Sequence, residues 1–269
     1  MPHFDKLTSP AGRELGVHLM IETITSRHNP LLVHVKKLLS SRAYRQARGE
    51  FAADGLKLLR EAIQWGFPIT SVILSQGIEC PELPDGVRVI CVPSDVMQSV
   101  SMMETPQGAL FTCRIPEAPP LRIAPGALIL DELQDPGNLG TILRTASAMQ
   151  TPVVLTDDCA DLWNPKTVRA SMGALFRMRV CVAQREDIIL CAQNTGVPLI
   201  AAALTPRAVD IRHATLNGAL IVGNEGRGIS DAFLNAADQE IVIPMDERCE
   251  SLNVAAATAI LLWEMRRDR

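Results

Sequence analysis

The sequence lacks the residue patterns that build metal centres, disulfide frameworks and hydrolytic triads. Its seven cysteines are an odd number and none belongs to a C-x-x-C pair, and its five histidines are dispersed. A structural zinc site and a disulfide framework are therefore not expected. No serine or cysteine lies in a nucleophile-elbow pattern, so the sequence gives little support to a hydrolytic triad.

Long apolar runs are also missing. No segment approaches the roughly 18 apolar residues of a membrane span, and the N-terminal stretch carries Asp5 and Glu14 in place of a signal-peptide core. Several cysteines lie in short apolar runs, such as 89–92 and 180–182, where a thiol behaves as a small hydrophobe. These features predict no membrane association and a cytoplasmic location, where cysteines stay reduced.

A net positive charge is absent as well. The 26 basic and 30 acidic residues give a formal charge of -4, so no global field draws the protein to nucleic acid. Any RNA or DNA site must then be a local patch. Residues 25–49 contain no Asp or Glu and form the one strongly basic stretch, with Arg27, Lys36, Lys37, Arg42, Arg45 and Arg48. Such a stretch is either a solvated face or a phosphate-binding surface.

The residues that are present describe a globular α/β protein. With 269 residues, 47% of them hydrophobic, the chain can bury one large core or two ordinary ones. Residues 1–20 have no periodicity and are expected to form a flexible extension. After them, helical patterns from Pro30 and over 56–65 alternate with apolar runs at 69–74, 87–92 and 109–113. Residues 21–115 are therefore predicted to form a small α/β domain.

A proline-rich segment, 116–126, marks the predicted linker to a second domain over residues 127–269. Continuous apolar runs alternating with helical patterns indicate a parallel sheet covered on both faces. The runs are 127–130, 153–155, 180–182, 199–203, 220–222 and 241–243.

Three polar segments follow predicted strands of this second sheet, where open α/β sheets bind ligands. In the first, 131–145, Pro136-Gly137 predicts a turn, Asn138 a helix cap, and Arg144 lies six positions further on. Taken alone, this segment is better explained as an ordinary capped loop with a surface arginine than as a ligand site. The second, 223–228, has three glycines in six residues, yet matches neither a dinucleotide fingerprint nor a phosphate-binding P-loop.

The third segment, 243–253, leads into an apolar C-terminal helix. Ser251 and Asn253 stand at the helix start, where capping alone would satisfy them. The helix is more apolar than a surface helix needs, so it packs in the core or in an interface. Between the first two segments, the run 166–177 contains Lys166, Arg169 and Arg177, which are either a solvated face or phosphate contacts.

Taken in order, these segments resemble a known family. N-L-G-T-I-L-R at 138–144, G-N-E-G-R-G at 223–228, and I-P-M followed by S-L-N-V-A within 243–255 closely resemble the three signature motifs of the SpoU/TrmH family of RNA ribose 2'-O-methyltransferases. The segments I-T-S-R-H-N-P at 24–30, G-E-F at 49–51 and T-P-Q-G at 105–108 are similar to that family's N-terminal substrate-binding domain.

The resemblance implies a fold that pattern rules do not give. The second domain would be a knotted SPOUT domain, in which the C-terminal segment threads a loop of the parallel sheet to form a deep trefoil knot, a rare exception to ordinary connections. The first domain would resemble the ribosomal L30e-type α/β sandwich. A homodimer is also implied, with the apolar C-terminal helix in its interface.

The resemblance further implies an S-adenosylmethionine-dependent enzyme that needs no metal. Its cofactor would be held by Gly223, Asn224, Ile243, Met245 and Leu252. Arg144 would be essential, either removing the proton of the 2'-hydroxyl or clamping the substrate phosphate and stabilising the alkoxide. A guanidinium is a poor base, so the resemblance leaves the choice between these two roles open. Asn138 would orient Arg144, and Glu225, Ser251 and Asn253 would complete the catalytic site. The predicted RNA contacts are Arg27, Asn29, Lys36, Arg42, Arg48 and Arg169.

Ribosomal RNA of the 23S type is the expected substrate, because the extra N-terminal domain is commoner among family members that modify ribosomal RNA. Transfer RNA is the alternative substrate, and a noncatalytic knotted RNA-binding or assembly factor is the alternative function. A knotted methyltransferase acting on a base is a further alternative. Two features depart from the family, namely Asp54-Gly55 where Glu-Gly is common and the low net charge. With only 4% aromatic residues, base stacking is expected to contribute little to RNA recognition.

Overall fold

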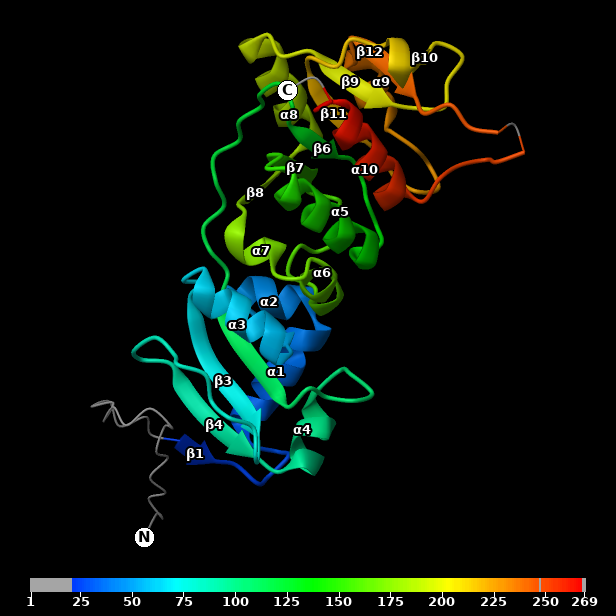
Figure 1. Cartoon of the computed structure of the whole chain (residues 1–269). Coiled ribbons are helices and arrows are strands. Elements are labelled where there is room, and N and C mark those ends of the chain that lie inside the picture. The colour runs from blue at the N-terminus through cyan, green and yellow to red at the C-terminus, as the bar shows by residue number, and fades with distance from the viewer. Residues whose placement is uncertain (1–20, 247, 268–269) are drawn as a thin grey trace.

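The computed structural model describes residues 21–246 and 248–267, which fold into two sheets lying one above the other (Figure 1). The extension predicted over residues 1–20 lies outside the described residues. The first sheet has the order β1-β4-β3-β5-β2, with β1, β4 and β3 parallel and β5 antiparallel to both β3 and β2. Its strands are β1 (Ile21–Thr23), β2 (Glu50–Asp54), β3 (Ile69–Ser75), β4 (Arg88–Val92) and β5 (Ala109–Arg114).

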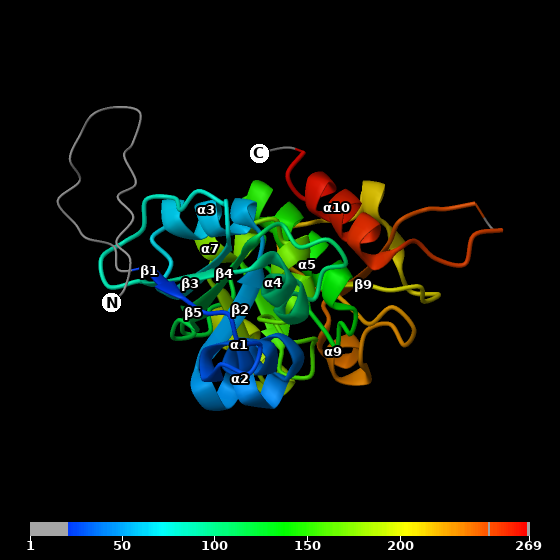
Figure 2. The ribbon, with the colours of Figure 1, turned by 90° about the horizontal axis from the view of Figure 1, so that it is seen from below.

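Helices cover both faces of the first sheet. They are α1 (Pro30–Ser40), α2 (Arg42–Arg48), α3 (Leu56–Gln64) and α4 (Ser94–Val100). Because side chains alternate along a strand, Ile73 packs with α1 and α4 while its neighbours Val72 and Leu74 pack with α3. Figure 2 shows α3 on one side of these strands and α1 and α2 on the other. The small α/β unit expected here is therefore an α/β sandwich.

The second sheet has seven strands, all parallel, in the order β10-β12-β9-β11-β6-β7-β8. They are β6 (Leu128–Leu130), β7 (Val153–Thr156), β8 (Val180–Ala183), β9 (Leu199–Ala202), β10 (Val209–Asp210), β11 (Ala219–Val222) and β12 (Gln239–Val242). This confirms the predicted parallel sheet. The trefoil knot stays a prediction that follows from the resemblance.

Both faces of the second sheet are buried. Helices α5 and α10 pack on the face that carries Leu128 and Leu220, and α8 and α9 pack on the face that carries Ile129 and Ile221. The helices are α5 (Pro136–Ala148), α6 (Pro165–Ala170), α7 (Ala174–Arg177), α8 (Arg185–Thr195), α9 (Asp231–Ala236) and α10 (Val254–Glu264), with a 3-10 turn at Ile211–His213. In the described ranges, no helix is both long and apolar enough to cross a membrane.

The sheet order predicts where the second domain binds a ligand. Strands β6 and β11 are neighbours at its centre, and the chain leaves them in opposite directions, toward β7 from the first and toward β12 from the second. Open parallel sheets bind ligands outside the carboxyl ends of such a pair. Asp131 and Gly223 directly follow the two strands, so the first two polar segments start at this point.

The two halves share one apolar core. The ring of Phe51 in β2 stacks on that of Trp163, with centroids 4.6 Å apart, and Phe67 packs edge-on against Phe176. Residues 115–127 connect the sheets, and Ile123 within this segment is buried against the second sheet. We propose 116–126 as the boundary between the first domain and the domain that carries the three motifs.

A buried ion pair joins the halves as well. Arg45 of α2 is only 3% exposed, and its Nε and Nη2 donate to Asp161 Oδ2 at 2.8 and 2.5 Å, while Nη1 donates to the Leu38 carbonyl. One basic residue of the predicted phosphate-binding stretch is therefore part of the domain interface. This contact accounts for an arginine buried in a surface helix.

Replacing Arg45 with methionine is expected to lower the free energy of unfolding by about 3–5 kcal/mol, because Asp161 would stay buried without its cation. Denaturant-induced unfolding measures this loss. The control is Arg88→Met, which breaks a pair with Glu22 that is about half exposed and should cost about 1 kcal/mol or less. Equal losses in the two variants would show that burial of the Arg45 pair does not matter.

Candidate active site

Three residues predicted for the active site meet in one hydrogen-bonded cluster. Asn138 Nδ2 donates to Glu225 Oε1 at 3.0 Å, and Asn253 Nδ2 donates to Asn138 Oδ1 at 3.1 Å. They come from the three polar segments and are 87 and 115 positions apart along the chain. The side chains lie at the surface, above the carboxyl ends of β6 and β11. We call Asn138, Glu225 and Asn253 the amide cluster.

The predicted capping role of Asn138 is wrong. Helix α5 begins at Pro136, and its N-cap is Asp135, whose Oδ1 accepts from the Asn138 backbone N–H at 2.7 Å. Proline fits the first position of a helix, where its missing N–H is not needed, so the helix starts earlier than expected. Because Asp135 caps the helix, the side-chain amide of Asn138 is available for the amide cluster.

The loop 223–228 is a tight turn closed by its own backbone. Asn224 and Gly228 exchange two backbone hydrogen bonds of 2.8 and 2.9 Å. The Asn224 side chain accepts from the amides of Gly226 and Arg227 and donates to the Glu132 carbonyl. Asn224, predicted to hold the cofactor, therefore shapes the loop with both its side chain and its backbone.

Gly223 must be a glycine for a steric reason. A Cβ placed there would lie 2.3 Å from the Gly228 carbonyl oxygen and 2.5 Å from the Ile229 nitrogen. These are backbone atoms and cannot move aside as a side chain would. The turn and the end of β11 are in such close contact that any side chain at position 223 would force them apart.

The residues of the third segment, 243–253, differ in how closely they lie to the amide cluster. Asn253 caps α10 by accepting from the amides of Ala255 and Ala256, as predicted, and also joins the amide cluster. Ile243 packs against the large core, Met245 is half-buried, and Leu252 is 39% exposed. Ser251 is exposed, and the described part of the chain gives its side chain no hydrogen bond to the amide cluster. The segment projects from the body of the protein (Figure 1).

Arg144 lies on α5, less than two turns after Asn138, with its side chain exposed. Within residues 21–246 and 248–267 its guanidinium has neither a hydrogen bond nor an ion pair. Most other arginines near the crevice are paired, as the ion pairs of Arg185 and Arg227 show. A free guanidinium beside the amide cluster can bind a phosphate or a developing oxyanion.

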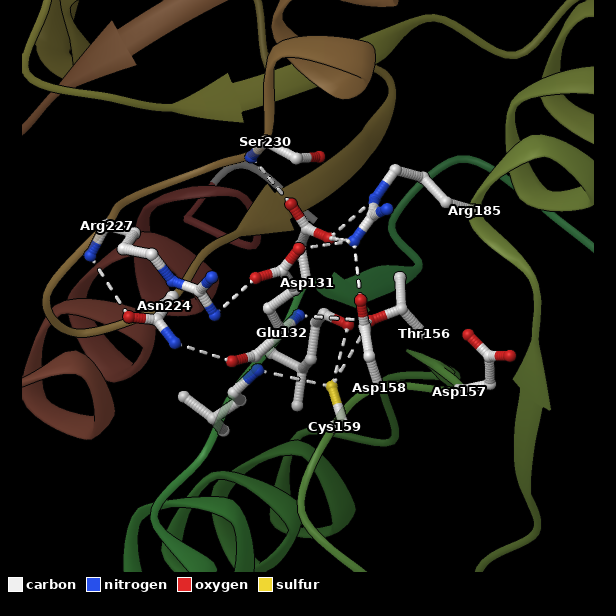
Figure 3. A network of polar contacts seen from close by, with 12 residues as sticks. Asp131, Glu132, Thr156, Asp157, Asp158, Cys159, Arg185, Asn224, Arg227 and Ser230 are labelled. Carbon is white, nitrogen blue, oxygen red and sulfur yellow. Dashed lines mark hydrogen bonds and ion pairs between the residues drawn. The ribbon is translucent and has the colours of Figure 1, made fainter.

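Sequence reasoning missed an ionic network beneath the site (Figure 3). Its members are Asp131, Glu132, Asp158, Arg185 and Arg227. Burial opposes ionisation of Asp158, but hydrogen bonds from Thr156 and Arg185 lower its pKa. The signal that could have revealed the network is position, since Asp131 and Arg185 both follow strands of one parallel sheet, at the same edge.

The six residues predicted to contact RNA differ in whether their side chains already have partners within the protein. Arg27 pairs with Asp95, Asn29 caps α1, and Arg48 lies over the Tyr44 ring. Arg42 crosses to the second half, where it donates to the carbonyls of Cys159 and Asp157 at 3.3 and 3.4 Å. The side chains of Lys36 and Arg169 have no hydrogen bond or ion pair among the described residues.

Of the other basic residues in the run 166–177, Lys166 pairs with the Asp135 carboxylate and Arg177 pairs with Glu61. Their charges are therefore largely balanced within the chain. The Arg169 side chain is exposed and has no hydrogen bond or ion pair among the described residues, and its charge opposes the rise that burial causes in the pKa of Asp54 in the first half.

Asp54, which stands where the family commonly has Glu, is a carboxylate in an unfavourable environment. Burial raises its pKa, although a hydrogen bond from Ser101 and the charge of Arg169 act in the opposite direction. Its Oδ1 is buried without a hydrogen-bond partner in the described chain. The group thus binds a proton more tightly in the folded state than in the unfolded state.

Asp54→Asn is expected to raise the free energy of unfolding at pH 7 and to weaken its pH dependence. Because the pKa of Asp54 is higher in the folded state than in the unfolded state, its protonation stabilises the fold at acidic pH. This contribution to the free energy of unfolding is lost as the pH rises through the folded-state pKa. At neutral pH the wild-type protein therefore contains an ionised, buried carboxylate that destabilises the fold. Unfolding between acidic and neutral pH measures this. Asp95→Asn is the control of opposite sign, because Arg27 lowers the pKa of Asp95; a stability loss in both variants would contradict the prediction.

Comparison with known proteins gives a consistent result. Residues 125–263 match the SpoU rRNA Methylase family, and residues 29–110 match an MRM3-like substrate binding domain. The chain is 34% identical to the 23S rRNA (guanosine(2553)-2'-O)-methyltransferase RlmP of Bacillus subtilis, over 86% of this chain and 94% of that protein.

A second relative, the 23S rRNA (uridine(2479)-2'-O)-methyltransferase of Streptomyces viridochromogenes, is 27% identical over 91% of this chain and 92% of its own length. Among solved structures, the AdoMet-bound rRNA methyltransferase of Sinorhizobium meliloti superposes with a TM-score of 0.81 at 29% identity. That alignment covers 92% of this chain and 98% of the other.

Proposed function

Because the chain belongs to the SpoU rRNA methylase family, we propose that it transfers a methyl group from S-adenosylmethionine to a ribose 2'-hydroxyl of ribosomal RNA. The resemblance predicted from three ordered motifs is confirmed by the family match over residues 125–263, which contains all three. The observation that carries the proposal is the amide cluster, because it joins one residue from each motif beside the unpaired Arg144.

The reaction requires a 2'-hydroxyl in line with the methyl group, and it releases one proton as the new oxygen–carbon bond forms. Positioning is therefore the main task of the site. The Arg144 guanidinium is free to donate to a substrate phosphate or to the alkoxide that develops as the proton leaves. Asn138 lies on the same helix, and its amide is held in place from both sides, by Glu225 and Asn253.

We propose that S-adenosylmethionine, which supplies the methyl group on a sulfonium, binds at the carboxyl ends of β9, β11 and β12. The chain exposes apolar side chains there, beside the turn 223–228. Leu204 is 64% exposed and Leu252 is 39% exposed, which is unusual for leucines and suits contact with an adenosyl group. Gly223 and Ile243 border this area, so we propose that backbone groups at 223 and 243–245 hold the cofactor.

Ribosomal RNA is proposed as substrate in preference to transfer RNA. Support comes from the N-terminal match at residues 29–110 and from relatives named for 23S rRNA that cover most of this chain. Lys36 and Arg169 are the cations we propose for direct phosphate contact, since the other predicted contacts already have partners. Arg42 and Arg45 are better explained as residues that fix the domain interface.

The test uses purified full-length protein, methyl-labelled S-adenosylmethionine, and unmodified 23S rRNA and transfer RNA in separate reactions. Label at one ribose of 23S rRNA, absent with Arg144→Ala, is the expected result. Label on transfer RNA instead would reassign the substrate. Cofactor binding without label on either RNA would favour a noncatalytic RNA-binding role.

We also propose that the protein is a homodimer joined through α10. Ala256, Ile260 and Trp263 lie on one face of this helix and are exposed, with Trp263 at 67% and Ile260 at 43%. An apolar stripe at this spacing on the last helix is suited to a second copy of the chain.

The cysteines at all seven positions are free, which supports a proposed cytoplasmic location.

Trp263→Glu is expected to convert the dimer to a monomer, because a charge would be buried in the apolar interface. Size-exclusion chromatography with light scattering measures the mass. Trp65→Glu, at a tryptophan that is 49% exposed in the first half, is the matched control and should leave the dimer intact. A wild-type monomer, or a dimer that survives Trp263→Glu, would refute the proposed interface.

A further inference from the structure

Arg185 occupies an unfavourable position for a cation. It is the first residue of α8, where the helix dipole is positive, and its side chain is only 18% exposed. Burying a cation there is costly unless it is compensated by specific partners. Its partners are three carboxylates, each from a loop at the same edge of the sheet (Figure 3).

The first partner, Asp131, directly follows β6 and is fully buried. One of its oxygens accepts from Arg185 Nε at 3.0 Å, and the other accepts from the Ser230 backbone N–H at 2.8 Å. Ser230 directly precedes α9, so Asp131 fixes the far end of the loop that starts at Gly223. Without Arg185 this carboxylate would be buried with no cation.

The second partner, Glu132, holds the middle and the start of the same loop. It accepts from Arg185 Nη2 at 2.9 Å and pairs with Arg227 at 2.6 Å, while its carbonyl accepts from the Asn224 side chain at 2.8 Å. Glu132 also has a positive φ of 53°, an uncommon conformation outside glycine. Such a backbone conformation persists only when its surroundings hold it.

The third partner, Asp158, accepts from Arg185 Nη2 at 2.8 Å. It belongs to the segment 157–161, which Arg42 and Arg45 of the first half also hold, through the Asp157 and Cys159 carbonyls and the Asp161 carboxylate. Arg185 thus connects the domain interface to the loop 223–230. Glu225 of the amide cluster lies in this loop, between the two points fixed by Glu132.

We propose that Arg185 is a positioning residue for methyl transfer, which sets the place of Glu225 relative to Asn138 by holding Asp131 and Glu132. The proposal rests on the proposed function. In the described chain, the polar contacts of the Arg185 side chain are with these three carboxylates, so its loss acts through the loop. A displacement of about 1 Å at a reacting centre can cost about 100-fold in rate.

The experiment compares wild type, Arg185→Met, Arg185→Lys and the exposed control Arg88→Met, with active sites counted by S-adenosylmethionine binding. With unmodified 23S rRNA, kcat of Arg185→Met is expected to fall about 100-fold while KM for RNA changes little. Arg185→Lys should recover part of kcat, since it restores the charge without the fork, and Arg88→Met should match wild type. In parallel, hydrogen exchange of the Ser230 amide should accelerate in Arg185→Met only.

The double variant Asp131→Asn/Arg185→Met separates positioning from charge balance. It removes the buried charge of Asp131 and keeps an acceptor for the Ser230 N–H, so folding is restored, but Glu132 and Asp158 still lack Arg185. We expect kcat to remain low. Full recovery of kcat, or a wild-type kcat in Arg185→Met, would overturn the inference. If wild type itself transfers no methyl group, the proposed function fails, and unchanged Ser230 exchange in Arg185→Met would then separately overturn the positioning role.

Discussion

Arg144→Ala is expected to reduce methyl transfer by about 100- to 1000-fold, the cost of removing one donor from a preorganised oxyanion site. Arg144 is exposed on α5 beside the amide cluster and has no partner among the described residues, so its guanidinium is available to the substrate. Its removal should leave cofactor affinity and stability close to those of wild type. Single-turnover methylation of unmodified 23S rRNA, with calorimetric titration of S-adenosylmethionine, measures both quantities.

Two further variants sharpen this prediction. Arg122→Ala removes an exposed arginine from the connecting segment and should not alter turnover. Arg144→Lys keeps the charge but not the planar fork that grips a phosphate with two hydrogen bonds. Near-normal turnover in Arg144→Lys would rule out a fork-specific role, and normal turnover in Arg144→Ala would remove Arg144 from the mechanism altogether.

Gly223→Ala is expected to weaken S-adenosylmethionine binding by about 100-fold, equivalent to about 3 kcal/mol of overpacking. The added Cβ would lie 2.3 Å from the Gly228 carbonyl oxygen. The turn would have to open, which breaks the paired hydrogen bonds between Asn224 and Gly228 and displaces the backbone groups proposed to hold the cofactor. Calorimetry on the purified protein measures the affinity.

Gly226→Ala is the matched control in the same turn. Its nearest neighbour to an added Cβ is the Asn224 side-chain oxygen at 3.7 Å, an ordinary contact. Its affinity should therefore stay near wild type. If both alanine variants bind the cofactor equally well, then the close approach at Gly223 does not shape the binding site.

The strands of the second sheet could be predicted because both faces are buried, so each strand is a continuous apolar run. Strands β1 and β10 could not be predicted in this way. Ile21 and Val209 are exposed at sheet edges. Strand β1 has three residues and β10 has two, and each is defined by its pairing, with β4 and β12 respectively, rather than by a sequence pattern of its own.

The site divides in a similar manner. The three motifs could be found by their order, and the structure brings one residue of each together. The wrong cap at Asn138 arose because Asp135 and Asn138 are both good caps, and the choice depends on where Pro136 starts the helix. Arg185 escaped notice because Arg185-Glu186-Asp187 has the composition of a solvated helix start, while its partners lie 27 to 54 positions away.

The stacked rings and the Arg45–Asp161 pair between the two halves have a consequence for target choice. These contacts hold α1, which carries the proposed phosphate contact Lys36, at a fixed distance from Arg144 on α5. We expect the modified ribose to be chosen by its distance from the docked RNA element. Inserting one base pair between them should abolish methylation, whereas exchanging base pairs at constant length should preserve it.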